Sequence, residues 1–146
     1  MKNGFTLVEL LIVIGIIVIL AAATIPIYGN LQISSQLNDN NLLIIQALRS
    51  AKERSVVGYN NSSHGVKFFS NQFVLYQGSS YAARNSSYDS VTELAPVLSL
   101  STTLNNDEIN FSKGLGVPDN VGTTTLAHSS GGERTVSVNS LGKVEE

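Results

Sequence analysis

The sequence contains no cysteine and only two histidines among its 146 residues. Without cysteine there is no disulfide framework, no thiolate nucleophile and no zinc site with cysteine ligands. Charged residues are also scarce, at 14%, and the formal net charge is −2 at pH 7. This composition argues against a chain that holds nucleic acid through bulk positive charge. The length fits one domain of ordinary size plus an additional element.

Local signatures of common enzyme sites are missing as well. Neither G-x-S-x-G nor H-E-x-x-H occurs, and Gly114-Leu115-Gly116 lacks the remainder of a dinucleotide fingerprint, so we expect a turn there. His64 and His128 lie in stretches rich in serine and glycine, at predicted loops or strand ends. We therefore expect solvated histidines, no catalytic residue, no metal site and no cofactor.

Charge is almost absent between Phe5 and Ile27, where a run of 23 residues carries one ionisable side chain, Glu9. As a helix rising about 1.5 Å per residue, this run would be roughly 34 Å long, which is enough to cross a bilayer core. Lys2 is the only basic residue before the run, and the next is Arg49. The positive-inside tendency therefore predicts a cytoplasmic N-terminus and an extracytoplasmic remainder.

The position of Glu9 separates two ways of processing such a segment. An ordinary secretory signal would be cleaved in the small-residue stretch 21–23, but an acidic residue would then only weaken membrane insertion. A cut between Gly4 and Phe5 instead creates an α-amino group one helical turn from Glu9, on the same face. A lone carboxylate in hydrocarbon costs several kcal/mol or takes up a proton, whereas a nearby ammonium group lets it stay charged. The amine belongs either to the same chain or to a neighbour in a packed array of helices, where pairing would drive docking and set the axial register.

The stretch Gly4-Phe5-Thr6-Leu7-Val8-Glu9, with the apolar run that continues to Pro26, resembles the class III signal of type IV pilins and type II secretion pseudopilins. The resemblance implies that a prepilin peptidase cleaves after Gly4 on the cytoplasmic side and that Phe5 is N-methylated. It implies that Glu9 pairs with the N-terminus of a neighbouring subunit. The implied location is the bacterial inner membrane, single-pass with an extracytoplasmic head, and then a pilus or pseudopilus.

The same resemblance implies the partners of the chain. They are the prepilin peptidase, other pilin or pseudopilin subunits, an inner-membrane assembly platform and, before assembly, membrane lipid. Beyond Pro26, which we expect to kink the helix, apolar residues return at mostly helical intervals as far as Val56, and Gly58 is a plausible stop. The expected organisation is a leader, a membrane or filament-core helix, an amphipathic helix and a β-rich head, at 1–4, 5–27, 28–57 and 58–146.

The head is predicted to consist of short antiparallel strands. Ser70-Asn71 is a candidate two-residue turn, residues 78–90 read as a loop, and 91–104 is ambiguous because Pro96 argues against a central strand. The fold class is therefore α+β and pilin-like, with a long bent N-terminal helix packed against an antiparallel sheet. The expected strands are 66–69, 72–76, 108–111, 123–127, 135–138 and 143–144.

A second resemblance lies in the head, where Ile109-Asn110-Phe111-x-x-Gly114 and 134–138 are similar to the C-terminal region of GspH/FimT-like minor pilins. It implies a minor subunit that helps to initiate or cap a filament. Some FimT-like minor pilins bind DNA during uptake, and that alternative would need Lys113, Arg134 and Lys143 to converge into a basic patch. Acidic neighbours in the sequence offset this patch, so nucleic acid is a less favoured partner. A third hypothesis, an exported enzyme that uses the helix only as an anchor, lacks any local signature.

Overall fold

The computed structural model describes residues 4–146, except for the side chains of residues 23–28. It divides into two compact units, Met1–Ser35 and Gln36–Glu146, and each is described by itself. The helix α1 (Leu7–Val56) contributes to both units. All other helices and strands belong to the second unit, here called the head.

The first unit is helical from Leu7 onward, and its apolar side chains are not covered by other parts of the described chain. From Leu7 to Leu20 every large apolar side chain is at least half exposed. A helix that is apolar all round requires an apolar environment from outside the chain. Within the described residues, no helix is both long enough and apolar enough to span a bilayer. The kink expected at Pro26 falls among the side chains that lie outside the described residues, and it stays a prediction.

One of the two sheets in the head contains the predicted hairpin. Strands β1 (His64–Phe68) and β2 (Gln72–Gln77) pair antiparallel, and Phe69 N–H donates to the Gln72 carbonyl at 2.8 Å across the turn at Ser70-Asn71. Strand β3 (Ser90–Glu93) lies on the far side of β2, and β5 (Glu108–Phe111) lies on the far side of β1. The resulting order is β3-β2-β1-β5, with all neighbours antiparallel.

The other sheet contains the last three strands and one strand from the ambiguous segment. It has the order β4 (Leu98–Thr102), β6 (Gly122–His128), β7 (Glu133–Val138) and β8 (Val144–Glu145), again antiparallel throughout. The head thus has two sheets, where the sequence suggested one. Pro96 lies in the turn between β3 and β4, in which Leu98 N–H donates to the Ala95 carbonyl at 2.8 Å. Because Pro96 lies between β3 and β4, which are edge strands of different sheets, its missing N–H interrupts the hydrogen bonding of neither sheet.

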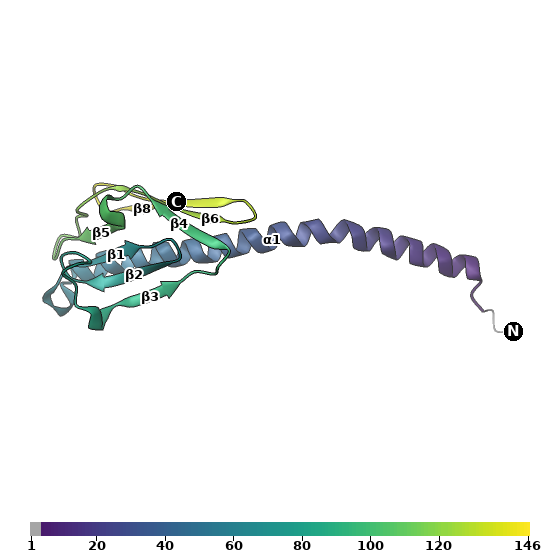
Figure 1. Cartoon of the computed structure of the whole chain (residues 1–146), viewed down its shortest axis with the longest axis horizontal. Helices are drawn as coiled ribbons and strands as arrows, with labels where there is room; N and C mark the ends of the chain where they lie inside the picture. The colour runs from purple at the N-terminus through teal and green to yellow at the C-terminus, as the bar shows by residue number, and fades with distance from the viewer. Residues whose placement is uncertain (1–3) are drawn as a thin grey trace. The chain divides into compact units, whose positions relative to one another are not determined.

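The C-terminal part of α1 packs against both sheets, and strands of both lie along it in Figure 1. Its buried apolar residues recur at the three- and four-residue spacing of one helical face. They are Leu37, Ile44, Ile45, Leu48 and Ala51. The largest fully buried side chains of the strands include Tyr76, Phe73, Phe111, Ile109 and Leu126. The predicted α+β class, with a long helix on antiparallel sheets, is confirmed.

Two further features connect α1 to the strands. Between residues 36 and 41, three side chains of α1 make polar contacts with the second sheet or the residue after it: Gln36 contacts His128, Asn38 contacts Arg134 and Asn41 contacts Glu146. At the other end, α1 stops at Val56, and Gly58 adopts φ +64, a left-handed conformation that favours glycine after a helix. The predicted stop at Gly58 is thereby explained.

Candidate processing and assembly site

A hydrogen-bonded cap closes the start of α1, and Glu9 is part of it. Thr6 N–H donates to Glu9 Oε2 at 3.0 Å, and the Thr6 hydroxyl donates to the same oxygen at 2.9 Å. In return, Thr6 Oγ1 accepts from Glu9 N–H at 3.2 Å. This reciprocal arrangement is a capping box, in which a threonine before the helix and a glutamate three residues later satisfy backbone donors that the helix leaves free.

Thr6 is therefore a capping residue that the sequence-based interpretation did not assign. The signal that identifies it, a T-x-x-E spacing before an apolar run, is visible in the sequence. The cap gives Glu9 a role within its own chain, in addition to the intersubunit pairing that the resemblance implies. Any test of the pairing must separate these two roles.

The residues around the expected cleavage point are open to solvent. Phe5 is 85% exposed, and Gly4 and Glu9 are also exposed. A Cβ added at Gly4 would meet no described atom within 4 Å. Nothing within the described chain therefore requires glycine at position 4, so a requirement for it would have to come from a molecule that binds there.

The three basic residues proposed for DNA contact do not converge. Each already contacts a neighbour in the head: Lys113 contacts Asn61, Arg134 contacts Asn38, and Lys143 forms an ion pair with Glu145. Asn38 lies 18 residues before the end of α1 at Val56, a distance of about 27 Å along the helix axis. Lys113 lies beyond that end, beside Gly58. The structure thus gives no basic patch formed by these residues.

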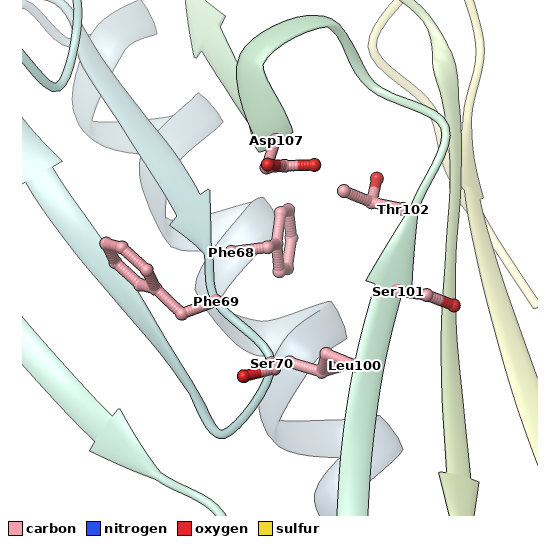
Figure 2. A pocket seen from close by; sticks show the side chains of 7 residues that line it. All are labelled: Phe68, Phe69, Ser70, Leu100, Ser101, Thr102 and Asp107. Atoms are coloured by element: carbon pink, nitrogen blue, oxygen red, sulfur yellow. The ribbon is translucent and has the colours of Figure 1, made fainter.

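A cleft of about 230 Å³ opens where the end of β1, strand β4 and Asp107 meet. Figure 2 shows Phe68 on the side of the chain that faces β4, and Phe69 directed to the opposite side. Phe69 packs there against the Tyr81 ring, with centroids 5.6 Å apart. The lining combines phenylalanine, leucine, serine, threonine and one aspartate, and neither histidine of the chain contributes to it.

The expectation of a solvated His64 is wrong. This histidine is the first residue of β1 and is 1% exposed. Its backbone N–H donates to Ser55 Oγ at 2.8 Å. Its two ring nitrogens have no hydrogen-bond partner among the described residues. Burial lowers the pKa of His64 and the nearby Arg54 charge lowers it further, against a smaller opposing effect of the Ser62 backbone. His128 ends β6 as a half-buried residue, with Nε2 3.2 Å from Gln36 Oε1.

Comparison with known proteins gives one family match and one structural match. Residues 1–25 match the prokaryotic N-terminal methylation motif. No curated protein matches the chain. Among solved structures, the chain is similar to the minor pseudopilin EpsH from the Type 2 Secretion System of Vibrio cholerae, with a TM-score of 0.59 and 13% identity, over 75% of this chain and 94% of that one. That likeness establishes the fold, and the motif match identifies residues 1–25 as similar to a prepilin N-terminal segment.

Proposed function

We propose that this pilin-like structural subunit is a minor component of a type II secretion pseudopilus or a type IV pilus. In this proposal the chain is cut after Gly4, N-methylated on Phe5 and assembled through its N-terminal helix. The observation that carries the proposal is the continuous exposure of apolar side chains from Leu7 to Leu20, with one carboxylate at the start of the run. Membrane lipid would cover these side chains before assembly, and the helices of other subunits would cover them afterwards.

Glu9 would supply a specific attraction between subunits, which apolar packing alone does not provide. Lipid tails are as apolar as leucine, so two apolar helices in a bilayer gain little hydrophobic free energy by meeting. A carboxylate in that environment is unfavourable until it finds a cation. An N-methylated amine on the Phe5 of a neighbouring subunit provides one, and it is available only after the leader has been removed. The charge pair would then select processed subunits and fix their axial register.

The proposed location and partners follow from the same arrangement. The helix would sit in the bacterial inner membrane with the N-terminus cytoplasmic, where a prepilin peptidase reaches Gly4. The head would lie outside the cytoplasm until an inner-membrane assembly platform moves the subunit into a filament with other pilins.

N-terminal mass spectrometry of the full chain, extracted from bacterial membranes, tests the processing step. We expect a mature protein that begins with N-methyl-Phe5. A mature start near Thr24 would instead identify ordinary secretion, and an intact leader in assembled filaments would refute the proposed role of cleavage.

Two matched substitutions separate the charge of Glu9 from its cap. Glu9→Gln keeps a side chain that can complete a capping box but removes the negative charge. Thr6→Ala removes the cap and leaves the charge in place. We expect Glu9→Gln to be cleaved normally and to enter filaments poorly, while Thr6→Ala enters them more readily. The reverse order in filament immunoblots would show that Glu9 acts through the helix cap.

A further inference from the structure

The cleft shown in Figure 2 lies at the seam between the two sheets of the head. One wall is the end of β1 with the turn that follows it, and the other wall is β4, which belongs to the other sheet. Leu100 N–H donates to the Ser70 carbonyl at 2.9 Å and joins the two walls. The volume of about 230 Å³ is below the roughly 300–1,000 Å³ typical of pockets for drug-sized ligands. The cleft therefore has a size that suits a single side chain.

The walls of the cleft are largely apolar. Phe68 and Leu100 line it with side chains that belong to the core, since the two residues are 3% and 8% exposed. The hydroxyl of Thr102 is already used, because it donates to the Thr123 carbonyl at 3.0 Å. Figure 2 shows the Ser101 hydroxyl directed away from Phe68. A molecule in the cleft would therefore contact mainly hydrocarbon on these walls.

Asp107 is the only charged residue among those that line the cleft. It is exposed, and its carboxylate has no hydrogen-bond donor and no ion-pair partner among the described side chains. Lys67 is a cation close to this loop, but its Nζ donates to the Asn106 carbonyl and lies 5.6 Å from the centroid of the Phe69 ring. Phe69 is directed to the side of the chain opposite Phe68. The cleft thus carries a negative charge that no cation of the described chain pairs with.

The backbone around Asp107 has a conformation that matters for testing the cleft. Asn106 and Asp107 both have positive φ, at 53 and 49, in the left-handed region. Among residues with a side chain, asparagine and aspartate adopt this region most readily. Asparagine can therefore replace Asp107 without a new backbone penalty, so that the charge alone is changed.

We propose that this cleft binds the side chain of a lysine from a partner protein. The alkyl stem of the lysine would lie against Phe68 and Leu100, and its ammonium group would pair with Asp107. Lysine side chains bury their stem along apolar surface and keep the charged head in water, and the cleft offers apolar walls next to an exposed carboxylate. A free diamine fits less well, because its second ammonium would find no carboxylate among the lining residues. This contact concerns the head alone and goes beyond the proposed filament role.

Two matched probes test the ligand chemistry by NMR titration of the full chain in nonionic detergent. N-acetyl-lysine methylamide carries the proposed side chain, and N-acetyl-norleucine methylamide has a similar alkyl stem without the ammonium group. The amide signals of Ser70 and of residues 100–102 report on the cleft. We expect saturable shifts with the lysine probe at millimolar concentrations, and binding of the norleucine probe at least about twofold weaker, as for the loss of one exposed ion pair. Equal affinity for both probes, or no shift of these signals, would overturn the proposal.

Two substitutions test whether Asp107 carries the interaction. Asp107→Asn is expected to weaken binding of the lysine probe about two- to fivefold, the effect of one exposed ion pair, and to leave the norleucine probe unaffected. Glu53→Gln is the control, because it removes an exposed carboxylate of α1 that does not line the cleft. Undiminished binding of the lysine probe to Asp107→Asn, or an equal loss in Glu53→Gln, would overturn the proposal. The same spectra show whether each variant is folded, so a loss of binding is distinguishable from unfolding.

Discussion

The buried His64 makes the stability of the head depend on pH in a predictable direction. His64 is 1% exposed, and the positively charged Arg54 lies nearby. Burial and this charge lower its pKa in the folded state below the ordinary value of 6.5. Below about pH 6.5, His64 therefore binds a proton in the unfolded chain at pH values where it stays neutral in the folded chain.

The sign and the upper limit of the effect follow from this difference. Well above pH 6.5 both states are neutral at this position, and the full free energy of unfolding is present. As the pH falls from 6.5 toward the folded-state pKa, the free energy of unfolding decreases by at most about 1.4 kcal/mol per pH unit for one proton. Below the folded-state pKa both states are protonated, and the loss stops growing.

Urea unfolding of the full chain in detergent, between pH 8 and pH 5.5, measures this slope. The window stays above the range in which ordinary carboxylates titrate. His64→Gln retains a neutral polar side chain without a titrating ring, so we expect a nearly flat profile for this variant. His128→Gln serves as the control for the loss of a histidine elsewhere in the head. An identical slope with and without His64 would refute the reasoning.

Two further substitutions probe the packing of the head. Gly65→Ala is expected to destabilise it by about 1–3 kcal/mol, because the new Cβ would lie 2.5 Å from the Tyr76 hydroxyl, and an unchanged melting temperature would contradict this packing. Glu146→Ala is expected to cost about 1–3 kcal/mol, because it removes the acceptor of the buried Asn41 amide. Urea unfolding measures that loss, and Glu145→Ala, which breaks only an exposed ion pair, should cost less.

Local patterns in the sequence predicted the local parts of the fold well. The hairpin of β1 and β2 was predicted because its strand residues and its Ser70-Asn71 turn are contiguous, so no long-range information was needed. The end of α1 was predicted for the same reason, since Gly58 supplies the left-handed conformation that stops a helix. The capping box at Thr6 was equally local and was missed only because Glu9 already had an explanation.

Features that depend on distant pairing were not predictable in this way. Strand β3 (Ser90–Glu93) was assigned partly to a loop because, at an exposed sheet edge, it has no run of buried apolar residues to reveal it. The division into two sheets depends on which strand β4 joins, and its pairing with β6 is set by packing rather than by neighbouring residues. The burial of His64 also depends on distant pairing, because His64 lies opposite Phe111 of β5 in the sheet.

The cap at the start of α1 has a consequence for maturation. Its bonds join Thr6 and Glu9 to each other, and they use no atom on the N-terminal side of Thr6. Removal of the leader after Gly4 would therefore leave the conformation of the first helical turn unchanged. It would change only the charge at the N-terminus. The peptidase before cleavage and a neighbouring subunit after it would therefore contact the same backbone conformation at the start of α1. The only difference would be the new protonated α-amino group.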